Sequence, residues 1–159
     1  MKHVFLALLF TVSVVITSAS CGKGNDSVSN KSNTENNNNQ DTMSSKLKIR
    51  IGSQTFTATL LNNNSTKAFV AMLPLTISMA DLNGNEKHAD FSSHLPTNSS
   101  NPGTIQNGDI MLYGSRTLVL FYKSFQTSYS YTKLGSVNDA SGFAAALRGG
   151  SISATFELE

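Results

Sequence analysis

A strict alternation of apolar and polar residues begins at Lys46, and it restricts the fold more than any other feature of the chain. In residues 46–51 every second side chain is apolar, and residues 54–60 repeat the pattern. Gly52-Ser53 separates the two stretches, and a two-residue loop with Gly first is typical of a type II′ turn. The sequence therefore predicts a β-hairpin here, within a mainly β domain.

More strands are expected after this hairpin, each bounded by Gly, Asn or Pro. They cover residues 75–80, 109–113, 117–122, 128–137 and 151–158. Residues 117–122 are apolar on both faces, as in a strand that is buried on both sides. Residues 81–104 are polar and rich in turn formers, so a loop with a type I′ turn at Asn83-Gly84 is expected there.

Two short helices complete the expected domain. The first covers residues 66–73 and is closed by Pro74. The second is capped by Asn138 or Asp139, places Phe143, Ala146 and Leu147 on one face, and ends at Gly149. Strands in this number with two short helices indicate a barrel or a sandwich over residues 46–159.

The N-terminal residues have the composition of an export signal. Met1-Lys2-His3 is basic, residues 4–16 are apolar apart from one Thr and one Ser, and small residues precede Cys21. The apolar run is too short to span a bilayer, so residues 1–20 are interpreted as a signal peptide. The region around Cys21, the single Cys of the chain, resembles the lipobox of bacterial lipoproteins, with Ser18 where an aliphatic residue is usual. An ordinary signal peptide with a coincidental Cys remains the alternative.

Residues 21–45 have the composition of a disordered tether. Of the 24 residues that follow Cys21, 15 are Asn, Ser, Thr or Gln, and Val28 is the single large aliphatic residue. Such a segment buries too little apolar surface to offset the entropy of ordering.

The export signal and Cys21 together predict the localisation. We expect the domain outside the cytoplasm, on the periplasmic or cell-surface side of a bacterial membrane, to which a lipid on Cys21 anchors it.

Several kinds of chemistry find little support in the sequence. A formal net charge of +2 is too small for a nucleic-acid partner. With one Cys and with His88, Asp90 and His94 in a polar loop, no metal site is expected, and these side chains are interpreted as solvated. No glycine-rich phosphate loop, nucleophile elbow or cofactor motif is present, so no cofactor is expected.

The order of these elements resembles the bacterial cyclophilin-like family, a relative of the cyclophilin prolyl isomerases. The strings that carry the likeness are Gly-Asp-Ile-Met-Leu-Tyr-Gly at 108–114, Leu-Val-Leu-Phe-Tyr at 118–122 and Ser-Tyr-Ser-Tyr-Thr-Lys-Leu-Gly at 128–135. The resemblance implies a closed barrel of about eight strands with two capping helices. The resemblance also implies that family members occur fused to flavodoxin-like domains. Nothing in this chain resembles such a domain.

The same resemblance makes isomerase activity doubtful. Cyclophilins use an Arg in a Phe-His-Arg-x-Ile-Pro-x-Phe-Met-x-Gln-Gly-Gly string to stabilise the twisted prolyl amide, and residues 78–97 contain no Arg. Tyr131 stands where the cyclophilin pocket carries His. No catalytic residue is therefore assigned.

The sequence supports a binding domain better than an enzyme. The expected pocket comprises four tyrosines and one Arg, namely Tyr113, Tyr122, Tyr129, Tyr131 and Arg116. Tyr129 and Tyr131 are two residues apart and so share one face of the predicted strand. Packing of these rings in the core is the alternative interpretation. The preferred function is a non-catalytic, membrane-tethered domain that binds a peptide, a protein or a small molecule. The alternatives are a prolyl isomerase or folding helper of the cell envelope, and a module that docks on a flavodoxin-like or other partner protein.

Overall fold

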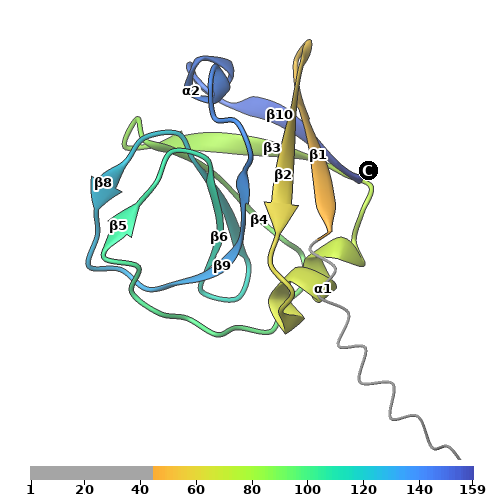
Figure 1. Ribbon diagram of the computed structural model, residues 1–159, viewed down its shortest axis with the longest axis vertical. Helices are drawn as coiled ribbons and strands as arrows, with labels where there is room; N and C mark the ends of the chain where they lie inside the picture. Colours follow the sequence, from red (N-terminus) through yellow and green to blue (C-terminus); the bar gives the residue numbers. More distant parts are fainter. Residues whose placement is uncertain (1–44) are drawn as a thin grey trace, which may run out of the picture. The chain divides into compact units, whose positions relative to one another are not determined.

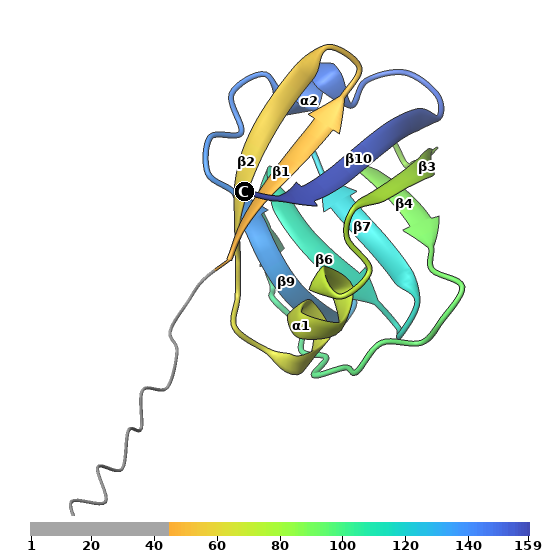
Figure 2. The same cartoon turned by 90° about the vertical axis from the view of Figure 1, so that its right-hand side faces the viewer.

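Pairing of the first and last strands closes an antiparallel barrel. In the computed structural model, which describes residues 45–159, β1 (Lys46–Ile51) pairs with β10 (Ile152–Leu158) (Figures 1 and 2). The order around the barrel is β1-β10-β3-β4-β7-β6-β9-β2. The remaining strands of the barrel are β2 (Gln54–Leu60), β3 (Leu75–Leu82), β4 (Glu86–Asp90), β6 (Asp109–Tyr113), β7 (Thr117–Phe121) and β9 (Tyr131–Val137). The predicted mainly β fold, a closed eight-stranded barrel with two short helices, is confirmed.

Two tight turns have the backbone that their residues predict. Gly52, between β1 and β2, has a φ of 58°, a conformation that glycine adopts without steric cost. Asn83 and Gly84 have φ values of 55° and 63°, as the two central residues of a type I′ turn require. This turn joins β3 to β4, so the prediction of a strandless loop over residues 81–104 was wrong. Polar side chains on both faces of β4 conceal its alternation.

The helices lie at opposite ends of the barrel (Figure 2). Helix α1 (Asn64–Val70) begins after Asn63, whose side chain accepts a hydrogen bond of 2.8 Å from the Thr66 amide. Helix α2 (Phe143–Ala146) begins after Gly142, which is left-handed at a φ of 76° and provides no side-chain cap. The prediction that Asn138 or Asp139 caps α2 was therefore wrong.

Apolar side chains fill the interior of the barrel. The Phe69 ring of α1 packs edge-on against Phe156 of β10, with ring centroids 5.8 Å apart. At the other end, Phe143 of α2 packs edge-on against Phe56 of β2, at 5.0 Å. The fully buried side chains of the interior include Leu47, Ile49, Leu60, Met79, Ile110, Leu112, Leu118, Leu120 and Leu134.

A two-stranded ribbon outside the barrel is an element that the sequence did not reveal. It pairs β5 (Thr104–Ile105) with β8 (Phe125–Gln126). After β8 the chain reaches β9 only at Tyr131, so residues 128–130 precede the strand in which they were expected. The predicted signal peptide, the predicted lipid attachment at Cys21 and all but the last residue of the predicted tether lie outside the described residues. No helix within residues 45–159 has the length and apolar character needed to cross a membrane.

Candidate ligand-binding cleft

The outer face of the barrel carries a second apolar cluster. Strand β7 is buried on both faces, because Leu118 and Leu120 face the interior while Val119 and Phe121 face outward. The ribbon packs on this outer face through Ile105 and Phe125, with the Phe125 and Phe121 ring centroids 5.7 Å apart. Beside the ribbon the face remains open as a cleft of about 450 Å³. Its twelve lining residues are Leu82, Asn83, Asn85, Glu86, His88, Asp90, Tyr113, Thr117, Val119, Phe125, Tyr129 and Tyr131.

Three tyrosines form the aromatic wall of this cleft. Tyr113 of β6 and Tyr131 of β9 are partners in the sheet, and their ring centroids are 5.6 Å apart. Tyr129 lies before β9 and meets Tyr113 edge-on, at 6.2 Å and an interplanar angle of 89°. The exposed fraction rises from 6% at Tyr131 to 46% at Tyr113 and 61% at Tyr129. The wall therefore runs from a buried ring to a largely exposed one.

Strand β4 supplies the polar side of the cleft. Lys87 and Ala89 face the interior, so Glu86, His88 and Asp90 face outward by the alternation of a strand. The Asp90 carboxylate accepts a hydrogen bond of 2.6 Å from Thr117 Oγ1 on the neighbouring strand. Glu86 is only 8% exposed. Among the described residues no side chain or backbone group donates a hydrogen bond to its carboxylate.

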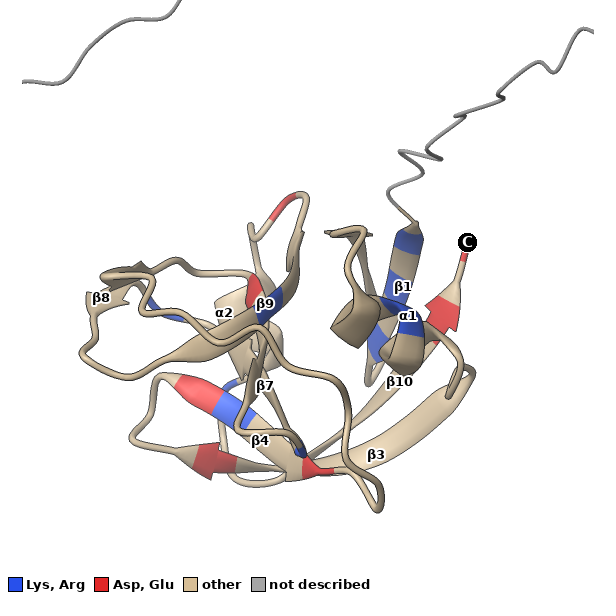
Figure 3. Ribbon diagram, turned by 90° about the horizontal axis from the view of Figure 1, so that it is seen from below, with Lys and Arg blue, Asp and Glu red and all other residues tan. Residues whose placement is uncertain are grey.

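The electrostatics of the cleft follow from this arrangement. Burial raises the pKa of the Glu86 carboxyl, and the negative charge of Asp81 raises it further. Burial raises the pKa of the Tyr131 hydroxyl, and the charge of Glu86 adds to that effect. Lys and Arg residues lie along β1 and on α1 (Figure 3). None is among the described residues that line the cleft. Its fixed charges are therefore carboxylates.

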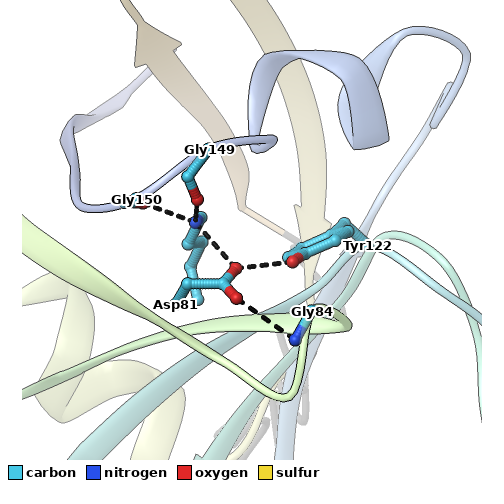
Figure 4. A network of polar contacts seen from close by, with 6 residues as sticks. Asp81, Gly84, Tyr122, Gly149 and Gly150 are labelled. Carbon is cyan, nitrogen blue, oxygen red and sulfur yellow. Dashed lines mark hydrogen bonds and ion pairs between the residues drawn. The ribbon is translucent and has the colours of Figure 1, made fainter.

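Lys87, on the inner side of the same strand, is the centre of a separate polar network (Figure 4). Its ammonium group is fully buried and donates to Asp81 Oδ1 at 2.8 Å and to the carbonyls of Gly149 and Gly150 at 2.7 and 2.6 Å. The Tyr122 hydroxyl donates to the same Asp81 oxygen at 2.5 Å. Hydrogen bonds from Lys87 and Tyr122 hold the pKa of Asp81 below its ordinary value. Burial and the Asp81 carboxylate raise the pKa of Tyr122 to about 12.

The structure brings three of the five predicted pocket residues together. Tyr113, Tyr129 and Tyr131 line the cleft, although Tyr129 does so from a loop and not from a strand. Tyr122 belongs instead to the Lys87 network. Arg116 lies outside the cleft lining and donates from Nε to the Phe91 carbonyl at 3.0 Å. Glu86 and Phe125 were missed, because β4 has polar side chains on both faces and the two-residue strand β8 carries no periodicity.

The other arginines of the barrel are also placed away from the cleft. Arg50 of β1 pairs with Glu157 of β10. Arg148 follows α2 and lies beside Tyr122 and Gly149 in a separate depression. A prolyl isomerase of the cyclophilin type needs a guanidinium against the bound prolyl nitrogen. The described residues lining this cleft do not supply one.

The sequence model of the Cyclophilin-like family matches residues 49–157. The solution structure of the hypothetical protein AF2241 from Archaeoglobus fulgidus is similar, with a TM-score of 0.52 and 15% sequence identity. The match covers 76% of this chain and 99% of the archaeal one, and at this identity it concerns the fold alone. No curated protein matches the chain significantly.

Proposed function

Because the chain belongs to the cyclophilin-like family, we propose that its barrel is a non-catalytic binding domain whose ligand occupies the tyrosine-lined cleft. One observation carries the proposal: three rings and a buried carboxylate converge on a cleft of about 450 Å³. That volume is within the usual range for sites that take a small molecule or a short peptide segment. Aromatic side chains are typical of the walls of such sites, and polar groups fix the orientation of the ligand.

The absence of an arginine from the described lining supports binding over isomerisation. Rotation about a prolyl bond has a barrier of about 18–20 kcal/mol, and catalysis must stabilise the twisted state preferentially. In this cleft the polar groups are carboxylates, an imidazole, amides and hydroxyls. An ionised carboxylate does not donate hydrogen bonds, and the imidazole, amides and hydroxyls can donate but lack the permanent positive charge of a guanidinium.

Tyrosine emission tests the binding proposal directly. The chain has no Trp and four Tyr, of which three line the cleft, so a bound ligand changes most of the intrinsic fluorescence. A library of short peptides and small molecules is titrated against the protein and against Tyr131→Ala. Tyr122→Phe is the matched control, because it removes the one tyrosine outside the cleft.

Ligands that quench the native protein and Tyr122→Phe, but bind Tyr131→Ala at least tenfold more weakly, support the proposal. Binding that survives Tyr131→Ala and Tyr113→Ala unchanged overturns it. A protease-coupled peptide assay addresses the isomerase alternative. We expect no rate above the thermal one, and an enhancement abolished by changing Arg50, Arg116 or Arg148 would establish the enzyme instead.

We also propose that the domain is held at a membrane by a lipid on Cys21. The support is the sequence: a basic start, a short apolar run, small residues and then the single Cys. A lipoprotein anchor carries more than one acyl chain, as stable attachment requires. Cys21→Ala should move the protein from the membrane fraction to the soluble one, with Ser20→Ala as the control. Retention of Cys21→Ala in the membrane fraction would refute the anchor.

A further inference from the structure

Glu86 is only 8% exposed and no described group donates a hydrogen bond to its carboxylate, which is costly for a charged group. Its chain neighbour Lys87 does not compensate it, because the Lys87 ammonium is enclosed on the opposite side of the barrel wall by three acceptors. Buried carboxylates in folded proteins are normally paired or hydrogen-bonded. Glu86 therefore lacks, within the described domain, the cation or donor that its position requires.

A second acceptor in the cleft is also without a donor. Asn85 Oδ1 is buried and has no hydrogen-bond partner. Asp90, further along β4, receives one hydrogen bond from Thr117, which leaves acceptor capacity on its carboxylate. The polar side of the cleft thus presents acceptors in excess, in a lining without Lys or Arg.

The opposite side of the cleft is suited to a positive charge of a particular kind. The Tyr131 and Tyr113 rings are inclined at 52°, and the Tyr113 and Tyr129 rings at 89°, so the rings pack tilted and edge-on, and all three line the cleft. Aromatic faces attract ammonium groups within about 6 Å of the ring centroid, and several rings around one ammonium form an aromatic cage. An alkyl chain attached to that ammonium gains from contact with Val119 and Phe125.

We infer that the cleft binds an alkylammonium group, with the charge between the tyrosine rings and the Glu86 carboxylate. This inference rests on the proposed binding function and specifies the chemistry of its ligand. The ammonium supplies a partner for Glu86. An anionic ligand would meet two carboxylates, and a neutral one would leave Glu86 without an opposite charge.

The alkylammonium can belong to a free amine or to a lysine side chain, and paired probes separate the two sources. Pentylamine represents the free amine, and Nα-acetyl-lysine N-methylamide represents a lysine within a peptide. Pentanol and the Nε-acetylated lysine derivative are their neutral counterparts. Tyrosine emission and backbone amide shifts are recorded for the full-length protein at pH 8.

We expect both charged probes to bind at least tenfold more tightly than their neutral counterparts, with amide shifts centred on β4 and β9. Glu86→Gln should weaken their binding at least tenfold, whereas Glu157→Gln, the same change outside the cleft, should leave it unaltered. Tighter binding of the lysine derivative than of pentylamine identifies a peptide or protein lysine as the source, and equal binding identifies a free amine.

Two outcomes would overturn the inference. Neutral probes that bind in the cleft as tightly as charged ones would leave the proposed binding function standing and remove its cationic ligand. Charged probes that bind equally to Glu86→Gln would show that the carboxylate is not the recognition group. The proposed function itself is decided separately, by the loss of library ligands on Tyr131→Ala.

Discussion

Glu86 and Lys87 are neighbours on β4, and both are buried, but only the lysine has a partner. The Lys87 ammonium has three acceptors inside the barrel end, whereas no described group donates to the Glu86 carboxylate outside it. One of these charges therefore stabilises the fold, and the other is a cost to it. Such a cost is characteristic of a functional group, because binding sites are built for ligands and not for stability.

Glu86→Gln should make the protein more stable at neutral pH, by on the order of 1 kcal/mol, because it removes an unpaired buried charge. The folded state binds the Glu86 proton more tightly than the unfolded chain does, since its pKa is raised from 4.5. The free energy of unfolding therefore falls as pH rises from about 4.5 through the folded pKa. Urea unfolding between pH 4 and 8 should show this fall in the native protein and lose it in Glu86→Gln. A destabilised Glu86→Gln at pH 7 would contradict the assignment.

Asp81→Asn should have the opposite pH dependence. The pKa of Asp81 is lowered from 3.8 by Lys87 and Tyr122, so its contribution is fully present above that value and is lost as pH falls through the folded pKa. The variant should be less stable than the native protein at pH 7, and the difference should shrink towards pH 2. Asp139→Asn, in an exposed turn, is the control and should show no such convergence.

Lys87→Met should destabilise the barrel by about 2 kcal/mol, because it removes the hydrogen bonds that the buried ammonium donates. The affected groups are the carbonyls of Gly149 and Gly150 and the Asp81 carboxylate. Thermal unfolding measures the effect, with Lys46→Met on the exposed start of β1 as the control. A Tm equal to that of the Lys46→Met control would mean that the network adds nothing to stability.

Gly135→Ala should destabilise the domain by about 3 kcal/mol, at the upper end of the usual range for overpacking. A Cβ atom at Gly135 would overlap the Thr59 carbonyl oxygen and come within 3.0 Å of Leu60 Cα, where β9 pairs with β2. Gly150→Ala is the matched control, because a Cβ atom there has no neighbour within 4 Å. Equal urea midpoints for the two variants would exclude a tight β2–β9 contact.

Local pattern was sufficient for the parts of the fold in which one face of a strand is buried. The alternation in residues 46–60 predicted β1, β2 and their turn, and the double-sided apolar run predicted that β7 is covered on both faces. The pattern failed at β4, because one of its two inward side chains is Lys87 and its outward ones are polar too. It also failed at β5 and β8, since two-residue strands carry no periodicity.

The same failure limited the prediction of the site. Tyr113, Tyr129 and Tyr131 were recognised as one group, and the structure brings them together. Tyr122 was grouped with them by residue type, although the side-chain alternation after Phe121 directs it to Asp81 instead. The acidic side of the cleft is formed by β4. Glu86 could not be predicted as a cleft residue, because the position of β4 in the barrel depends on the strand order, which no local pattern contains.

The place of β10 has a consequence for the order in which the barrel forms. This strand lies between β1 and β3, so residues 152–158 complete two of the eight seams, and Leu47 pairs with Leu158 from the far end of the domain. Contacts between residues so distant in sequence form slowly. In a chain synthesised from its N-terminus, the edges of β1 and β3 stay unpaired until the final strand emerges. Until then, both edges are open to pairing with other chains.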